Sequence, residues 1–276
     1  MPERFVRILF VGDIVGDAGM LAVSEHLPKL QELYKIDCTI VNGENIWNGK
    51  GLSEADAATL FSLGVDCITT GNHIWENWKS KPLLASNLPV LRPLNYPSGN
   101  TGKGFCTVTT HSGHTIGILQ LQGRIYMSPI DCPFKAADFA VPKLRQTTKV
   151  VIVDLHAEAT AEKVAFGHYL DGSVSAILGT HTHIQTADDQ ILPKGTGYIT
   201  DVGMTGPYDS VLGLKTDIAL QRMLLQTAHK YESASGNPKL CGVFLIVDSE
   251  TGKTTHIERI MLPGLLRSID KIIESN

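Results

Sequence analysis

Seven residues of metal-binding type stand just after short apolar runs of the sequence. They are carboxylates, side-chain amides and imidazoles without any thiolate, a ligand set that suits Mn²⁺, Fe or Zn²⁺. Seven ligands exceed the need of one ion that keeps an open position, so they favour two ions bridged by a carboxylate and a hydroxide. The candidates are Asp13, Glu44, Asn45, Asn72, His156, His181 and His183.

Buried strands of a parallel sheet would position these residues. The apolar runs have no gap for a solvent-facing side, and helical spacing over 18–34 and 53–63 separates the first three of them. Ser53 is a plausible N-cap, and Gly64 ends that helix. This order predicts a mainly parallel sheet, whose strands end at one ligand-binding edge. The predicted strands are 7–12, 38–42, 65–70, 150–155 and 174–178.

The rest of the chain adds strands and helices but no repeat, low-complexity run or linker. Further strands are predicted at 105–110 and 115–122 as an antiparallel pair, at 197–202, and at 243–248 and 254–260 as a hairpin. Helices are predicted at 161–170, 216–229 and after Pro263, and connections at 89–104 and 129–142. We therefore expect one domain, residues 1–276, with two sheets.

The composition excludes several classes of protein. With 24 basic and 28 acidic residues the net charge is −4, which argues against a globally basic nucleic-acid binder. No apolar run reaches the ~18 residues of a membrane span, and the first residues lack the ~7–15 apolar residues of a secretory signal. The five cysteines are widely spaced and form no CxxC pair, which argues against a disulfide framework. We expect a cytoplasmic protein without membrane contact.

Single members of the set have simpler explanations. An aspartate after a strand is commonly a turn or cap residue, so the argument depends on the same coincidence at five strand ends. Residues 12–19 carry GxxxGxxG, not the GxGxxG of dinucleotide loops, so a dinucleotide-binding site is disfavoured there.

The tryptophans and the remaining histidines are expected to have structural roles. Trp47, Trp75 and Trp78 are expected to pack near the cleft, with stacking on a base as the alternative. The histidines expected in the core or on the surface are His26, His111, His114, His168, His229 and His256.

The order of these residues resembles the calcineurin-like metallophosphoesterases, whose pattern runs D-x-H, an acidic bridge, G-N-H, a lone His and G-H-x-H. Val15 replaces the first histidine and Glu44 the usual aspartate, and both departures resemble one bacterial subfamily, the YmdB-like phosphodiesterases. The resemblance covers essentially the whole chain, including VGDIVGDAG, NGENIWNGKG, TTGNHIWEN, DLHAEATAEK, GTHTHIQTAD and TDVGMTGPYDSVLG.

The resemblance implies a four-layer α/β/β/α sandwich of two mixed sheets and a centre of two metal ions, with iron or manganese expected and zinc compatible. One ion would take Asp13, Glu44, Asn45 and His183. The other would take Glu44, Asn72, His156 and His181, so that Glu44 bridges. The implied activity is hydrolysis of phosphodiesters, including 2′,3′- and 3′,5′-cyclic nucleotides, and RNA is a further candidate partner.

A mechanism follows as a hypothesis. A hydroxide between the metals would attack phosphorus, and His73, directly after a proposed ligand, would protonate the leaving oxygen. Residues 91–104 and 203–209 are expected to select the substrate. A phosphomonoesterase such as a nucleotidase, and a metal- and nucleotide-binding regulator of RNA metabolism with weak turnover, stay as alternatives. A homo-oligomer is compatible with the sequence, which fixes no symmetry.

Overall fold

The computed structural model describes residues 3–264 and contains two sheets, six helices and one 3-10 helix in that range. The strands are β1 (Phe5–Val11), β2 (Cys38–Asn42), β3 (Cys67–Thr69), β4 (Phe105–Thr109), β5 (Thr115–Gln122), β6 (Val151–His156), β7 (Ala176–Thr180), β8 (Gln190–Ile191), β9 (Gly197–Ile199), β10 (Gly206–Pro207), β11 (Pro238–Asp248) and β12 (Thr254–Leu262). The helices are α1 (Gly16–Tyr34), α2 (Glu54–Ser62), the 3-10 helix η1 (Asn72–Trp75), α3 (Ser80–Ala85), α4 (Pro133–Arg145), α5 (Thr160–Leu170) and α6 (Thr216–Leu225).

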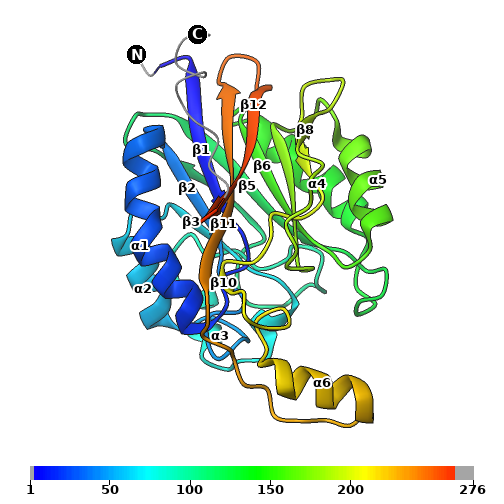
Figure 1. The fold of residues 1–276 in the computed structure, drawn as a ribbon. Helices are drawn as coiled ribbons and strands as arrows, with labels where there is room; N and C mark the ends of the chain where they lie inside the picture. Colours follow the sequence, from blue (N-terminus) through cyan, green and yellow to red (C-terminus); the bar gives the residue numbers. More distant parts are fainter. Residues whose placement is uncertain (1–2, 265–276) are drawn as a thin grey trace.

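The two mixed sheets pack face to face between helices (Figure 1). The first has the order β10-β11-β1-β2-β3 with β12 beside β11, and the second has the order β4-β5-β6-β7-β9-β8. Within them β1, β2 and β3 run parallel, as do β5, β6, β7 and β9. The predicted four-layer α/β/β/α sandwich is therefore confirmed.

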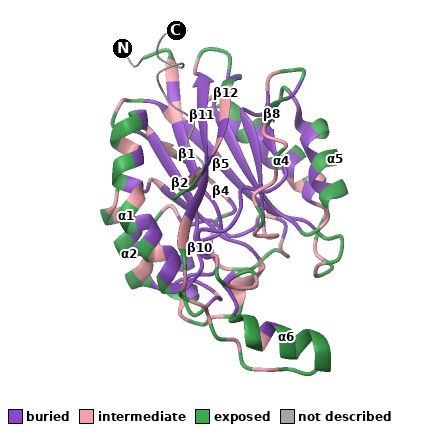
Figure 2. Ribbon diagram, in the orientation of Figure 1, coloured by how far each residue is buried: buried purple, intermediate pink, exposed green. Residues whose placement is uncertain are grey.

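Successive side chains along a strand point to opposite faces of its sheet, and this alternation explains how the sheets and helices form layers. In β1, Ile8 and Phe10 face the second sheet, whereas Leu9 and Val11 pack under the helices of the first sheet. Every side chain of β1 from Ile8 onward is buried, because the strand is covered on both faces. Figure 2 shows the same burial across the central strands of both sheets.

The helix α2 begins as the sequence predicts. The Ser53 hydroxyl accepts a hydrogen bond from the backbone N–H of Asp56, and the Asp56 carboxylate accepts one from the N–H of Ser53. Gly64, just after the helix, has a φ of +83°, the left-handed conformation that glycine adopts without strain.

Four helix and strand predictions need correction. The sequence predicts a connection over 129–142, but α4 covers much of that range, and Pro142 interrupts its helical pattern of Ala137, Val141 and Leu144. The short α3 also lies where the sequence predicts no helix. The helix predicted over 216–229 ends at Leu225, where Gln226 turns left-handed, and the strand predicted over 197–202 ends at Ile199.

The predicted helix after Pro263 falls outside the described residues apart from its first positions. Within 3–264, no helix is long and apolar enough to cross a membrane. The helix α6 projects from the body and is exposed on most sides (Figures 1 and 2).

Candidate metal centre

The polar residues singled out in the sequence follow five parallel strands at the carboxyl edge of the two sheets. Asp13 comes two residues after β1, and Glu44 with Asn45 follows β2. Asn72 and His73 open η1 after β3. In the second sheet, His156 is the last residue of β6, and His181 and His183 follow β7. The fold thus brings the carboxyl ends of these strands, from both sheets, to one edge of the molecule, and all eight residues lie at that edge.

Four of these residues meet directly around one ring nitrogen of the buried His156. Glu44 Oε1 lies 2.8 Å from His156 Nε2, and His181 Nδ1 lies 3.0 Å from the same nitrogen. Asn72 Oδ1 is 3.1 Å from His156 Nε2. Ligand atoms of Glu44, His156 and His181 all lie within 4.8 Å of one another, which is close enough for a shared ion.

Buried oxygen atoms without partners support a cation at this place. Asp13 Oδ1 and Asn45 Oδ1 are buried and make no hydrogen bond among the described residues, and buried Glu44 Oε1 has the His156 imidazole 2.8 Å away. A buried polar atom without a partner costs about 1–3 kcal/mol, so two such atoms after the neighbouring strands β1 and β2 need an explanation. Carboxylate, amide and imidazole groups can all bind a cation, so the residues present fit a metal.

Burial and neighbouring charges set the protonation of the cluster without metal. Burial alone would raise the pKa of Glu44, but His156 and the neighbouring imidazoles lower it to about 2. Burial opposes the charge of His156, yet Glu44 and Asp13 raise the pKa of that imidazole to about 9. Burial and the charge of His156 lower the pKa of His181 to about 3. The bare cluster is a carboxylate–imidazolium pair beside a neutral imidazole, so metal binding must release a proton.

A buried carboxylate behind the cluster is absent from the sequence-based predictions. Asp154 lies two residues before His156 on the same face of β6, and its Oδ1 accepts a hydrogen bond from Thr180 Oγ1 at 2.7 Å. The Thr180 oxygen in turn lies 2.9 Å from His156 Nδ1 and accepts a hydrogen bond from its N–H, since its own hydroxyl proton is donated to Asp154. This contact fixes the tautomer of His156 and leaves Nε2 to face Glu44. An aspartate inside the apolar run VVIVDL was the available signal.

The turn that carries His181 and His183 is strained and held by an aspartate. Both histidines have positive φ angles, +96° and +64°, which cost energy in residues other than glycine. Asp201 Oδ2 accepts hydrogen bonds from the backbone N–H and the hydroxyl of Thr182 between them, at 3.0 and 2.7 Å. Lys163 pairs with the same carboxylate at 2.8 Å and is fully buried. The pair Lys163–Asp201, which the sequence also did not predict, therefore holds the two imidazoles in place.

Gly71 leaves room for the cluster. A Cβ atom at this position would overlap His156 Nε2 and Cδ2 and the Glu44 carboxylate. Only glycine lets β3 end directly against these side chains.

Asn45 and His183 lie in the wall of a cavity of about 430 Å³ beside the cluster, here called the metal cavity. Asn45 Nδ2 donates to the Gly49 carbonyl, and His183 Nδ1 lies 3.1 Å from the Leu212 carbonyl. Neither makes a hydrogen bond to another predicted ligand among the described residues. The cavity wall also holds side chains that the sequence did not predict, one of them from α6, far away in sequence. They are Lys50, Glu158, Arg222 (from α6) and Tyr231.

His73 lies in the same wall with a partner of its own. Its backbone N–H donates to Glu44 Oε2 at 3.0 Å, and its Nδ1 lies 2.6 Å from Glu76 Oε1. Glu76 also pairs with Lys50. Because the Glu76 carboxylate accepts a hydrogen bond from Nδ1–H, Nε2 is the nitrogen of His73 that is free to exchange a proton.

The two segments expected to select the substrate lie outside the wall of the metal cavity. Residues 99–101 line a second cavity, and no residue of 203–209 lines the metal cavity. The role of both segments in substrate selection stays a prediction. The six histidines expected elsewhere are all outside the Glu44–His156–His181 cluster.

Comparisons with known proteins agree with this architecture. A family model described as YmdB-like protein matches residues 9–260. A protein of Bacillus subtilis (strain 168), named 2′,3′-cyclic-nucleotide 2′-phosphodiesterase, is 44% identical over 257 residues, which are 93% of this chain and 97% of that protein.

Two solved structures are also similar over nearly their whole length. A hypothetical protein from Thermus thermophilus is 42% identical with a TM-score of 0.87, over 93% of this chain and 98% of that one. A novel phosphatase from Mycoplasma pneumoniae is 35% identical with a TM-score of 0.87, over 95% of this chain and 94% of that one.

Proposed function

The chain belongs to the YmdB-like family, and from this premise we propose that it hydrolyses phosphodiesters with two bound metal ions, cyclic nucleotides being the substrate class. The observation that carries the proposal is the cluster of Glu44, His156 and His181, whose ligand atoms lie within 4.8 Å of one another. Two buried oxygen atoms without hydrogen-bond partners, Asp13 Oδ1 and Asn45 Oδ1, follow strands at the same edge. The name of the relative from Bacillus subtilis supports the substrate class, with the 2′,3′-cyclic form as the first candidate.

We assign the ligands as two sets that share one carboxylate. Asp13, Glu44, Asn45 and His183 would hold one ion, and Glu44, Asn72, His156 and His181 the other. Oxygen and imidazole ligands without thiolate suit iron or manganese, and zinc is compatible. Bound ions of this kind lower the pKa of a water molecule and offset the negative charge of phosphate oxygens.

The protein side chains then supply position and protons. In this proposal His73 Nε2 gives a proton to the leaving oxygen, while Glu76 holds the ring through Nδ1. Lys50 is paired with Glu76, so Arg222 is the cation of the metal cavity wall without an ion pair among the described residues. One such cation matches the single negative charge of a phosphodiester better than the double charge of a monoester.

Initial rates with Mn²⁺-loaded protein test the proposal, on 2′,3′-cyclic AMP, 3′,5′-cyclic AMP and 3′-AMP. The expected result is faster turnover of a cyclic diester than of the monoester. Glu44→Gln is the matched variant, because it keeps the size of a side chain that both ligand sets share. It should lower the metal content per chain and abolish turnover. Activity on 3′-AMP alone would indicate a nucleotidase, and full metal content in Glu44→Gln would refute the shared carboxylate.

A further inference from the structure

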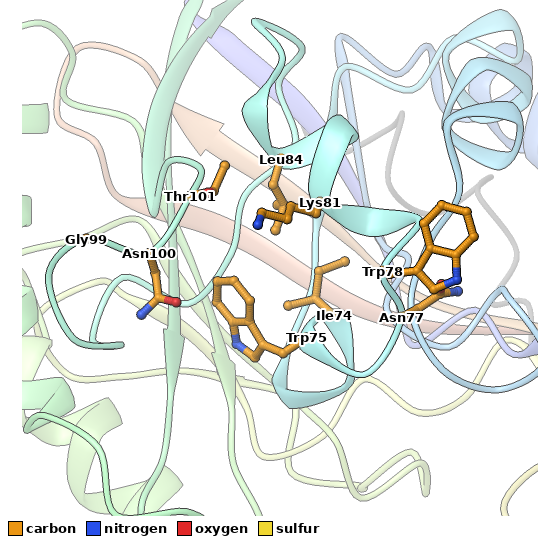
Figure 3. A pocket seen from close by; sticks show the side chains of 9 residues that line it. All are labelled: Ile74, Trp75, Asn77, Trp78, Lys81, Leu84, Gly99, Asn100 and Thr101. Carbon is orange, nitrogen blue, oxygen red and sulfur yellow. The ribbon is translucent and has the colours of Figure 1, made fainter.

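A second cavity, of about 330 Å³, lies against the same 3-10 helix that carries His73. Ile74 and Leu84 give it apolar walls, and Trp75 and Trp78 lie on opposite sides of Ile74 (Figure 3). Polar side chains, among them Lys81 and Asn100, complete it. We call it the tryptophan cavity. Its volume lies within the range of small-molecule sites, about 300–1,000 Å³.

One of its aromatic walls is held rigidly and the other is exposed. The ring of Trp75 packs against Tyr96, with 5.0 Å between centroids, and the Tyr96 hydroxyl donates to Gln122 Oε1 at 2.9 Å. Trp78 is 79% exposed, an unusual state for so large an apolar side chain. A fixed ring and an accessible ring across a cleft offer two faces on which a flat ligand can stack.

The polar groups at the rim are available to a ligand. In the described part of the chain, Lys81 has no ion-pair partner and the Thr101 hydroxyl has no hydrogen-bond partner. Asn100 uses its amide N–H to bind the Pro97 carbonyl, which leaves its side-chain oxygen as an acceptor. The cavity therefore offers a charged donor, a hydroxyl and an amide oxygen around apolar walls, a combination that suits the edge of a heterocyclic ring.

The tryptophan cavity adjoins the metal cavity. His73 lines the metal cavity, and the next residues of η1, Ile74 and Trp75, line the tryptophan cavity. A second link joins them, because Asn77 Nδ2 donates to the carbonyl of Lys50 at 3.4 Å. A ligand bound at both places would thus cross a single turn of backbone.

We propose that the tryptophan cavity binds a nucleobase joined to the phosphodiester that is cleaved at the metal centre. The inference rests on the proposed function and adds a base subsite to it. A nucleobase has flat faces that stack on indole rings and a polar edge that meets Lys81, Asn100 and Thr101. Base–aromatic stacking tolerates any base, so the subsite recognises the presence of a base more than its identity.

The test compares substrates with and without a base. The full-length, Mn²⁺-loaded protein is assayed on 2′,3′-cyclic AMP, on a triadenylate ending in a 2′,3′-cyclic phosphate, and on glycerol 1,2-cyclic phosphate, which lacks a base. Trp78→Ala and Lys81→Ala are the variants, since both side chains are exposed. Tyr169→Ala on α5 and Lys29→Ala on α1 are matched exposed controls.

The expected result is a fall of about tenfold in the ratio of kcat/KM for a base-bearing substrate to kcat/KM for glycerol 1,2-cyclic phosphate, carried by KM. The controls should leave the ratio at the wild-type value. A fall seen with cyclic AMP places the base of the cleaved nucleotide in the cavity. A fall seen only with the triadenylate places the base of the neighbouring nucleotide there. An unchanged ratio for both substrates overturns the proposal.

A separate measurement keeps the base subsite distinct from the proposed activity. If the wild-type protein cleaves none of these substrates, the proposed function fails while the cavity can still be probed with adenosine, which has no phosphate. Two of the three tryptophans line the cavity, so adenosine should quench tryptophan fluorescence in a saturable way. Lys81→Ala, which keeps every tryptophan, should weaken that binding about tenfold. No saturable quenching would overturn the subsite.

Discussion

Asn42 Nδ2 lies 3.0 Å from Asp154 Oδ2 and donates a hydrogen bond that joins the two sheets beside the candidate metal centre. Asp154 faces the interior between the sheets, where Thr69 of β3 also donates to it at 2.6 Å. Burial raises the pKa of the Asp154 carboxyl to about 7, against the opposing charge of His156. Since Thr180 connects the same carboxylate to His156, one buried group sets both the spacing of the sheets and the direction of a proposed ligand.

Thr180→Val should therefore weaken metal binding while the chain still folds. The substitution keeps the shape of the side chain but leaves His156 Nδ1 and Asp154 Oδ1 each without a hydrogen-bond partner. Loss of a partner that orients a metal-binding histidine costs typically 10–100-fold in metal affinity. Isothermal titration with Mn²⁺ measures the effect. Thr39→Val, which removes a buried hydroxyl bound to Gln31 outside the site, is the control, and equal affinities in the two variants would contradict the role of Thr180.

Gly71→Ala should abolish activity with little loss of secondary structure. The added methyl group would overlap the His156 ring and the Glu44 carboxylate, and Thr180 prevents that ring from turning aside. A displacement of about 1 Å in a catalytic site can reduce the rate about a hundredfold. The rate on 2′,3′-cyclic AMP and the metal content per chain are the measurements. Gly236→Ala meets its nearest neighbour, Asp209, only at 3.1 Å and should retain both.

The strands and the ligand-binding edge at their carboxyl ends could be predicted from the sequence because they depend on local patterns. Unbroken apolar runs such as 7–12 indicate strands buried on both faces, and parallel order then places their ends together. The family resemblance is confirmed by the family model. The ligand assignment stays a prediction, although the structure brings Glu44, His156 and His181 into contact.

Contacts between segments that lie far apart in the sequence could not be predicted from local patterns. Arg222 reaches the metal cavity only because α6 projects from the body and its following chain returns with Tyr231. Asp154 has no motif of its own, and its role depends on partners in the other sheet. The helix α4 was not predicted because Pro142 interrupts the helical spacing of its apolar residues. Packing of these residues against the second sheet stabilises the helix.

Stability should depend on pH through an ion pair far from the site. Arg4 Nη2 lies 2.9 Å from Asp248 Oδ2, and this hydrogen bond lowers the pKa of Asp248 to about 2. The unfolded chain ionises this carboxyl near ~3.9, so its contribution is complete above that pH and is lost as the pH falls towards 2.

Asp248→Asn should therefore lower the free energy of unfolding near neutral pH by about 1 kcal/mol or less, a typical value for a pair that includes an exposed partner. Urea unfolding of wild type and variant between pH 6 and pH 2.5 measures the difference, which should shrink below pH 4. Glu25→Gln, which removes a looser pair with Lys29 at 3.9 Å, serves as the control. A difference in the free energy of unfolding that grows as the pH falls would contradict the predicted direction of this pH dependence.

His73→Ala should separate metal binding from proton transfer. The backbone N–H of residue 73, which binds Glu44, stays in the variant, so the metal content should match wild type. The rate on 2′,3′-cyclic AMP should fall 10²–10⁴-fold, since the leaving alkoxide needs a proton. On bis(p-nitrophenyl) phosphate the loss should be much smaller, because nitrophenolate leaves without protonation.

Glu76→Gln is the matched variant for this role of His73. The amide can still contact His73 Nδ1 but removes the negative charge that faces the ring, so the rate on the cyclic diester should fall less than in His73→Ala. Both variants should also lose more rate on the cyclic diester than on bis(p-nitrophenyl) phosphate, since both substitutions affect the same proton transfer. Equal losses on both substrates in His73→Ala would mean that His73 positions the phosphate and donates no proton, and the leaving oxygen would then need another acid from the metal cavity.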